Sequence, residues 1–361
     1  MISKMKNVCE NCVLPESSVI HLDSNGKCNV CNSDSLNSFI LGKPDNAKLL
    51  EMIEQTRERG KSSDYDCLVG WSGGRDSTCL LYELVNTHKL RCVAVFGRTP
   101  FTPLVIVNNV RSIAEKLGIR LIEFNTPKKH LEVAKYCLTT FAKTKAPILI
   151  NLACASCKEV NIEMFRQAKR LRVKTIIYGG NRYEYIPLSP AAVDMDSNNR
   201  FSFYTMLKDN VIRIKRGIGI IMSSPRLLKY IFTFFKASVL YVNFYTVYLR
   251  LRFPKIERFD YYFHADWDES RVFEILEKLD WKLPEGCNST WRADCAFEAI
   301  KNKAFQQQLG FTYSHAMYSN LIRAHKITRE EAFRRLEKET VSEQRLSEVL
   351  KKLNLPENFL S

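Results

Sequence analysis

The sequence is short of long hydrophobic runs. Around its most basic segment, the longest uncharged apolar run covers residues 237–249, which is too short to cross a bilayer as a helix. The chain opens on polar, cysteine-bearing residues, so no signal peptide is visible at its start. Histidine is also scarce, with six in 361 residues, and His264, His315 and His325 each stand alone, which favours structural roles for them. We therefore expect a cytoplasmic protein whose cysteines stay reduced.

Basic charge, by contrast, is in excess. The 54 lysines and arginines outnumber 39 acids, and the net charge of +15 predicts an anionic partner: a nucleotide, a nucleic acid, an anionic sugar or a membrane surface. Much of the excess lies between Lys208 and Arg258, where basic residues are interleaved with aromatic ones. We expect residues 187–265 to form a helical insertion packed on the rest of the protein. Peripheral membrane contact and RNA binding are the alternatives.

Four of the twelve cysteines form two close pairs near the start of the chain. Cys9 and Cys12 are separated by two residues, as are Cys28 and Cys31. In a reducing compartment, two such pairs are typical ligands of one zinc ion, which four thiolates hold tetrahedrally. The intervening Asn25-Gly26 predicts the tight turn that brings the pairs together. We predict a zinc ribbon over residues 1–45, with a structural zinc because four thiolates leave no open position.

A glycine loop follows, in the stretch "CLVGWSGGRDSTCLLYELV". Its first residues read as a buried strand, and apolar residues recur at helical spacing over residues 80–85. A loop between a strand end and a helix start presents free backbone N–H groups and the positive end of the helix dipole. We expect pyrophosphate to be bound by Ser72, Gly73, Gly74, Arg75, Asp76 and Ser77. In this prediction Arg75, Asp76 and Ser77 are catalytic: Arg75 stabilises phosphate charge, and Asp76 orients magnesium or caps the helix.

The sequence around this loop predicts an α/β fold. "RCVAVFG", "IRLIEF" and "KTIIYGGN" read as further strands, and "VIVNNVRSIAEKLG" and "NIEMFRQAKRLRV" as the helices between them. This alternation predicts a doubly wound parallel sheet over residues 46–186, followed by the insertion and a helical region over residues 266–361. Ligands of such sheets bind beyond the carboxyl ends of the strands, so we add Gly179, Gly180 and Asn181 to the expected binding residues.

The hexapeptide "SGGRDS" resembles the SGGxDS signature of the PP-loop ATP pyrophosphatase superfamily, with Arg75 where lysine is commoner. This resemblance implies a HUP-like core that binds ATP and magnesium and transfers AMP to a substrate oxygen. Both ends of the chain, "CENCVLPESSVIHLDSNGKCNVC" and "ITREEAFRRLEKE", resemble the N-acetyl sugar amidotransferases of surface-polysaccharide (lipopolysaccharide) biosynthesis. That family implies adenylation of an acidic, nucleotide-linked sugar, with ammonia from a separate glutaminase subunit.

A third set of cysteines favours a different product. Cys154 and Cys157 precede a predicted helix, and the distant "STWRADC" contributes Cys295. One CxxC pair with one remote cysteine resembles the tRNA sulfurtransferases, in which three cysteines hold a [4Fe-4S] cluster with one iron left open. A second zinc site and a redox-inert pair are the alternatives. If Cys295 lies near the glycine loop, we expect Arg292 and Asp294 to contact substrate.

Overall fold

The computed structural model describes residues 7–126, 129–146, 148–184, 218–219, 222, 224–234, 249–339 and 341–360. Its centre is a sheet of five parallel strands in the order β3-β2-β1-β4-β5. The strands are β1 (Cys67–Gly70), β2 (Cys92–Arg98), β3 (Arg120–Asn125), β4 (Thr175–Tyr178) and β5 (Glu257–Asp260). The predicted α/β fold with a parallel sheet is confirmed, and β1 to β4 lie where the sequence predicts them.

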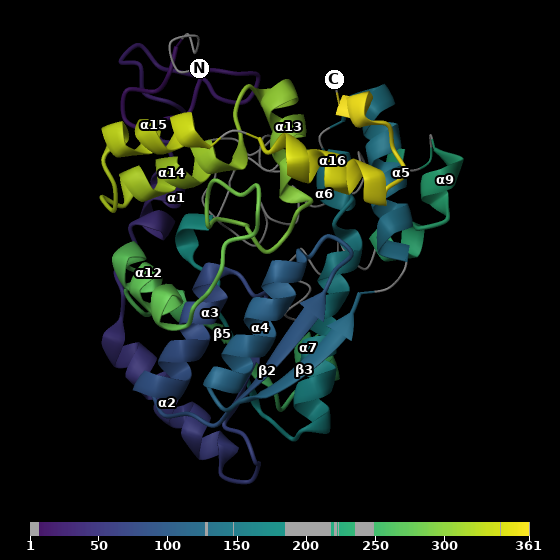
Figure 1. The fold of residues 1–361 in the computed structure, drawn as a ribbon. Coiled ribbons are helices and arrows are strands. Elements are labelled where there is room, and N and C mark those ends of the chain that lie inside the picture. The colour runs from purple at the N-terminus through teal and green to yellow at the C-terminus, as the bar shows by residue number, and fades with distance from the viewer. Residues whose placement is uncertain are drawn as a thin grey trace.

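Helices cover both faces of this sheet because its central strands are apolar on both sides. On one face, Val69 of β1 and Ala94 of β2 pack with α2 (Asn46–Gly60), α3 (Arg75–Tyr82) and α4 (Leu104–Lys116). On the other face, Leu68 and Val93 pack with α7 (Glu159–Arg170). Figure 1 shows α3 and α4 on one side of the strands and α7 on the other.

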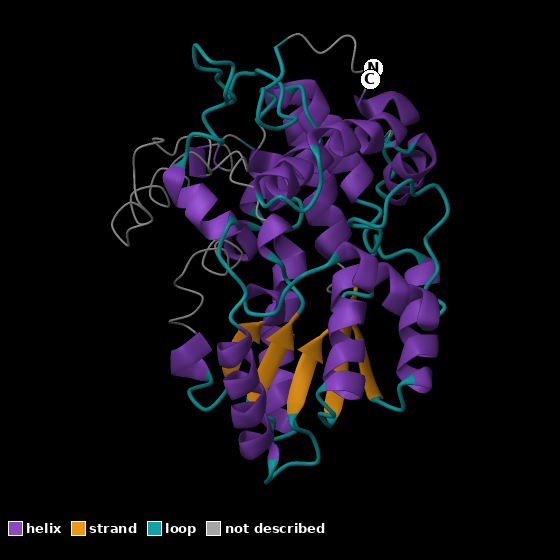
Figure 2. Cartoon of the chain, turned by 90° about the vertical axis from the view of Figure 1, so that its left-hand side faces the viewer, coloured by secondary structure: helices purple, strands orange, loops and turns teal. Residues whose placement is uncertain are grey.

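A helical half lies beyond the carboxyl ends of the strands. Figure 2 shows the arrowheads of the strands pointing toward it. A second apolar core joins α5 (Lys129–Thr144), α6 (Ile148–Leu152), α9 (Pro225–Leu228), α13 (Glu298–Leu309) and α16 (Glu343–Lys352). The pair α14 (Tyr313–Arg323) and α15 (Arg329–Lys338) lies beside α1 (Asp34–Ile40) and the N-terminal segment (Figure 1), and α12 (Glu269–Lys278) packs on α3.

One predicted boundary is wrong. We assigned residues 187–265 to a helical insertion and ended the sheet before it, yet β5 lies within that range and pairs in parallel with β4. The sequence of β5 is "ERFD", and Phe259 is the one buried side chain of this edge strand. A single buried apolar residue leaves no periodicity to detect, which explains the error. Most of the insertion itself, including residues 187–217 and 235–248, lies outside the described residues.

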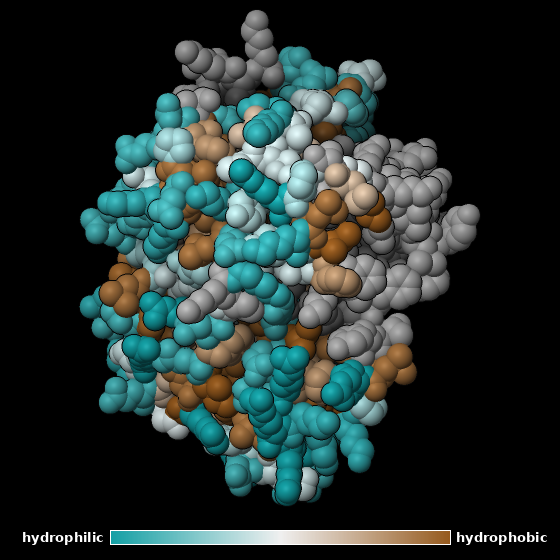
Figure 3. All heavy atoms as spheres, turned by 90° about the vertical axis from the view of Figure 1, so that its right-hand side faces the viewer, coloured by the Kyte–Doolittle hydropathy of each residue, from teal (hydrophilic) through white to brown (hydrophobic). Residues whose placement is uncertain are grey.

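Within the described ranges, none of the helices has the length and apolar character needed to span a membrane. On the face drawn in Figure 3, hydrophobic side chains occur in small groups among hydrophilic ones. Among the side chains that the structure describes, Phe232 and Leu251 are the most exposed large apolar ones, each 79% exposed. Both lie in the basic, aromatic part of the sequence.

Candidate functional site

The loop between β1 and α3 has a backbone that requires glycine. Gly73 has a φ of +80°, in the left-handed region that disfavours other residues. A Cβ atom at this position would lie 2.5 Å from Cγ2 of Ile106 and 2.8 Å from Cγ2 of Val110, both on α4. The indole Nε1 of Trp281 donates to the carbonyl of Gly73 at 2.9 Å. Packing against α4 and the hydrogen bond from Trp281 therefore hold the backbone of the loop in place.

Two serine hydroxyls lie at the mouth of this loop. Ser72 Oγ and Ser77 Oγ are 3.1 Å apart, and the backbone N–H of Gly74 donates to Ser72 Oγ at 3.2 Å. Gly74 is also the N-cap of α3 and brings no side-chain oxygen to the first turn of the helix. Ser77 Oγ also donates to the carbonyl of Gly74 at 3.1 Å. The N–H groups of the first turn, the helix dipole and two serine hydroxyls thus lie together, a combination that suits an anionic ligand.

A cavity of about 620 Å³ opens over the loop, within the usual size of a small-molecule site. Eight of the nine residues predicted to bind the nucleotide line it, and Gly73 does not: Ser72, Gly74, Arg75, Asp76, Ser77, Gly179, Gly180 and Asn181. The end of β4 comes so close to the loop that a Cβ atom on Gly179 would lie 2.9 Å from Cα of Ser77. The structure therefore brings two segments that are a hundred residues apart into one site.

Asp76 is buried, and both of its carboxylate oxygens accept hydrogen bonds. Asn181 Nδ2 donates to Oδ2 at 2.9 Å, and Trp267 Nε1 donates to Oδ1 at 3.1 Å. Burial raises the pKa of this carboxyl, and the neighbouring Arg75 opposes the increase. Asp76 makes no capping hydrogen bond to α3. Its position favours a role in joining the loop to Asn181 at the end of β4.

Arg75, whose guanidinium we predicted to stabilise phosphate charge, also has partners within the protein. Its guanidinium is 3% exposed, and Nη1 donates to Glu269 Oε1 at 2.9 Å and to Thr290 Oγ1 at 3.0 Å. The guanidinium carbon lies 3.2 Å from the centre of the Trp291 ring. Nε and Nη2 are buried without a hydrogen-bond partner. Arg75 thus connects α3 to α12 and to the loop before α13, because those partners attract its cation more closely than the loop mouth does.

Two further arginines line the cavity, each beside a carboxylate. Arg258, which sequence reasoning missed, lies 3.3 Å from Asp260 at the end of β5 and 4.4 Å from the centre of the Tyr178 ring. Arg292 lies 3.2 Å from Glu184, and this carboxylate raises the pKa of the guanidinium. Burial in turn raises the pKa of Glu184. Arg292 and Asp294, which we expected to contact substrate if Cys295 lies near the glycine loop, both line the cavity.

The four N-terminal cysteines are buried and converge as predicted. Their sulfur atoms all lie within 4.8 Å of one another, with Cys9 and Cys31 at 3.9 Å and Cys12 and Cys28 at 3.8 Å. Four thiolates at 2.3 Å from one zinc ion are about 3.8 Å apart in a tetrahedron. The spacing therefore fits a single tetrahedral ion of the zinc type.

The ends of α14 and α15 support this cysteine cluster. Arg323 donates through Nε to Cys31 Sγ at 3.3 Å and through Nη2 to Cys12 Sγ at 3.6 Å. Arg329 donates to the carbonyls of Cys12 and Cys9, at 3.0 and 2.9 Å. A divalent ion with four thiolates carries a net charge of −2, which these two cations offset.

The other predicted set, Cys154, Cys157 and Cys295, also meets in space. Cys154 forms a hydrogen bond with Cys157, and both Cys154 and Cys295 raise the pKa of the Cys157 thiol. In the described ranges, however, the N-terminal cysteines are the one group with all its donor atoms within 4.8 Å. His130, which we did not predict here, places Nε2 3.4 Å from Cys157 Sγ. The sulfur atoms of this set are therefore farther apart than the ligands of a single tetrahedral ion.

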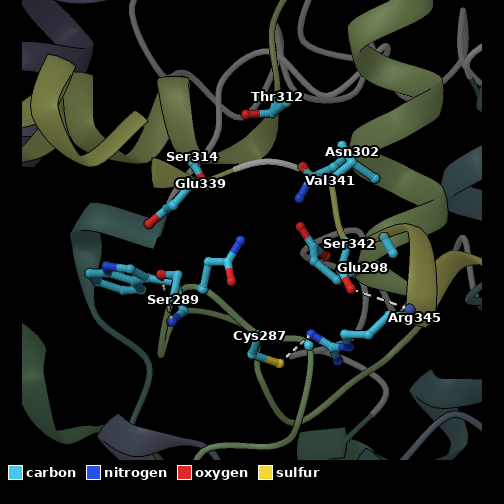
Figure 4. A pocket seen from close by; sticks show the side chains of 14 residues that line it. Cys287, Ser289, Glu298, Asn302, Thr312, Ser314, Glu339, Val341, Ser342 and Arg345 are labelled. Carbon is cyan, nitrogen blue, oxygen red and sulfur yellow. Dashed lines mark hydrogen bonds between the residues drawn. The ribbon is translucent and has the colours of Figure 1, made fainter. Parts of the chain in front are cut away.

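A second, smaller cavity of about 70 Å³ adjoins the first, and Trp291 lines both. Figure 4 shows the side chains that line it, which are mostly polar and include Glu298 of α13, Ser314 of α14, Glu339, Ser342 and Arg345. At one end, Arg345 Nη1 donates to Cys287 Sγ at 2.8 Å. Burial raises the pKa of that thiol, so the pair is best described as a neutral thiol beside a packed cation.

No protein-family model and no curated protein matches the sequence. Among solved structures, the chain is similar to NMN synthetase from Francisella tularensis, with 13% identity, a TM-score of 0.37, and 89% of this chain and 97% of that one covered. It is also similar to the U34-tRNA thiolase NcsA from Methanococcus maripaludis with its [4Fe-4S] cluster, with 14% identity, a TM-score of 0.34, and 93% and 90% covered. An NH3-dependent NAD synthetase from Campylobacter jejuni gives 13% identity, a TM-score of 0.28, and 54% and 95% covered. At such TM-scores the likeness assigns no function.

Proposed function

We propose that the chain is a PP-loop enzyme that uses ATP to adenylate a substrate oxygen, with release of pyrophosphate. The observation that carries this proposal is the meeting of the loop 72–77 with the strand end 179–181 in one cavity of about 620 Å³. The two serine hydroxyls and the start of α3 supply donors for an anion at the loop. The rest of the cavity is large enough for a nucleoside and a second substrate.

In the adenylation step, an oxygen of the substrate attacks the α-phosphorus of ATP. The bond from that phosphorus to the oxygen that bridges to the β-phosphorus breaks, and pyrophosphate leaves with the electron pair. Ser72, Ser77 and the N–H groups of α3 would bind the leaving pyrophosphate. The cavity carries carboxylates as well as arginines, so a bound triphosphate fits best with magnesium, which shields its charge when present.

For the second step, our first candidate is amide formation on an acidic N-acetyl sugar linked to a nucleotide, in surface-polysaccharide biosynthesis. Ammonia from a glutaminase subunit would attack the acyl carbon, and AMP would leave. The resemblance at both ends of the chain supports this candidate, as do two half-exposed cavity arginines, Arg258 and Arg292, for an acidic substrate. Peripheral contact with a membrane surface belongs to the same proposal, with the exposed Phe232 and Leu251 in its support.

Sulfur transfer to tRNA or to a small molecule is a second candidate, which the other cysteine set favours. Cys295 directly follows Asp294, which lines the cavity, and Cys154 and Cys295 both raise the pKa of the Cys157 thiol, which supports a location of this set near the proposed adenylation site. Three thiolates spaced more widely than a single ion requires fit a [4Fe-4S] cluster. Such a cluster would supply an iron site for sulfur, whereas this chain's residues would bind and adenylate the acceptor.

The decisive experiment combines two measurements. Pyrophosphate release is followed with nucleotide-linked uronic acids or with tRNA as acceptor, and with ammonium or sulfide as donor. Iron, zinc and acid-labile sulfide are measured on anaerobically purified protein. Ser77→Ala should lower pyrophosphate release at least about tenfold, whereas Ser62→Ala, on the surface turn after α2, should not change it. Ammonium-dependent product with zinc alone supports the amidotransferase, and about four irons with sulfide-dependent product supports the sulfurtransferase. No release with any acceptor would refute adenylation.

A further inference from the structure

Four carboxylates line the large cavity, and their surroundings differ. Asp76 accepts from Asn181 and Trp267, as described above. Glu184 is paired with Arg292, and Asp260 with Arg258. Asp294 is the exception, because no described side chain or backbone group forms a hydrogen bond or an ion pair with its carboxylate.

The unpaired carboxylate of Asp294 lies against the glycine loop. A Cβ atom on Gly74 would be 3.3 Å from both Cγ and Oδ2 of Asp294. Gly74 begins the helix that presents its N–H groups to the cavity. Oδ2 of Asp294 therefore lies beside the position where the proposed function puts a pyrophosphate.

A carboxylate and a phosphate repel each other at such a distance unless a cation lies between them. The same cavity is lined by the buried Arg75, whose Nη2 has no hydrogen-bond partner and whose Nε lies 3.4 Å from Asp76 Oδ1 without a hydrogen bond, so this cation could still attract an anion there. Magnesium prefers one or two carboxylates together with phosphate oxygens. A bridging divalent cation thus accounts for both the unpaired acid and the phosphate-binding loop.

We propose that Asp294 is the carboxylate ligand of the magnesium ion that accompanies ATP. Asp76, which the sequence suggested for this role, already uses both oxygens within the protein. The assignment rests on the proposed function, because it requires nucleotide in the cavity. It places the magnesium ligand on the loop 286–297, more than two hundred residues after the glycine loop in sequence.

The test uses the full chain, Mn²⁺ as the metal, and the ATP analogue in which a methylene group replaces the oxygen between the α- and β-phosphorus. Manganese bound to the protein with the analogue is measured by electron paramagnetic resonance. Binding of the metal-free analogue is measured by calorimetry in EDTA. The variants are Asp294→Asn, Asp294→Glu and Asp76→Asn. The control is Asp280→Asn, at an exposed position with a φ of +55°, which asparagine tolerates well.

We expect Asp294→Asn to weaken manganese binding about tenfold or more, yet to bind the metal-free analogue more tightly, because one negative charge is gone. Asp294→Glu should restore part of the manganese affinity, and Asp280→Asn should change neither value. Asp76→Asn should weaken both, since it disturbs the contact with Asn181. Unchanged manganese binding in a folded Asp294→Asn protein, or equal losses with and without metal, would overturn the assignment. If the wild-type protein does not bind the analogue, the proposed function itself fails, and the assignment with it.

Discussion

The two cysteine sets of this protein differ in how they are built. The N-terminal set lies within 23 consecutive residues, Cys9 to Cys31, and its four buried sulfur atoms already have the spacing of ligands around one ion. The second set joins residues 154 and 157 to residue 295, and its three half-buried cysteines are more widely spaced. The cysteines of the first set are all within one segment, whereas Cys295 of the second set directly follows Asp294, which lines the cavity.

This difference in spacing and location indicates that the two cysteine sets have different roles. Four thiolates around one ion would leave no position for a substrate, so we propose a structural role for the N-terminal site, which contacts α14 and α15 through Arg323 and Arg329. A wide set at the edge of a cavity fits a group that takes part in chemistry. The following predictions test the contrast through stability, acid sensitivity, metal affinity and metal content.

The largest effect is expected from Cys12→Ser. Loss of one thiolate should release the zinc, and Arg323 and Arg329 should lose their partners in the ribbon. We expect the free energy of unfolding to decrease by more than about 5 kcal/mol, since structural zinc sites contribute on the order of 10 kcal/mol to folding. Urea unfolding together with zinc content measures this. A folded, zinc-free variant of unchanged stability would show that the ribbon metal is dispensable.

A smaller effect is expected on the stability of the protein at acidic pH. It arises from a histidine on α14, the helix that contacts the N-terminal cysteines. His315 lies in the first turn of α14, and its Nδ1 accepts from the backbone N–H of Thr312 at 3.2 Å. Burial lowers the pKa of His315 to about 4. Because the folded pKa is below the unfolded value of 6.5, this contribution is present above pH 6.5 and is lost as the pH falls toward 4. It amounts to about 3 kcal/mol.

The comparison for this prediction is His315→Asn, which keeps a cap acceptor but does not titrate. Urea unfolding between pH 7 and pH 4 should show a weaker loss of stability in the variant than in the wild-type protein. The same steepness in both proteins would exclude His315 as a source of the acid sensitivity.

Next comes Arg323→Gln, which leaves all four zinc ligands in place. The variant removes the cation that donates to Cys31 and Cys12, so zinc should be held 10- to 100-fold less tightly, or by about 1.4 to 2.7 kcal/mol. Competition with a chromogenic chelator measures the affinity. Arg166→Gln, at a surface pair on α7, is the matched control and should leave the zinc affinity unchanged. Equal affinities for Arg323→Gln and the wild-type protein would contradict the charge argument.

The same contrast decides what sequence alone predicts. The ribbon, the glycine loop and β1 to β4 depend on local spacing, and the sequence predicts all of them. The direction of the Arg75 side chain depends on Glu269 and Trp291, about two hundred residues away, and the local sequence does not reveal these contacts. Arg258 was missed because β5 lacks an apolar pattern. Contacts between segments that are distant in the sequence depend on how the helices and strands pack. A single sequence does not reveal these contacts.

The smallest effect on stability is expected from Cys157→Ser, the counterpart of the first prediction. Cys157 is half-buried and supports no other module, so in metal-free protein the substitution should cost less than about 1 kcal/mol. If the second set holds an iron–sulfur cluster, anaerobically purified variant should lose its iron and sulfide and keep one zinc per chain. Cys12→Ser should do the reverse, with zinc lost first. Should Cys157→Ser lower zinc as well, or unfold the protein as Cys12→Ser does, the two sets would form one structural unit. The division between a closed structural site and an open chemical one would then be wrong.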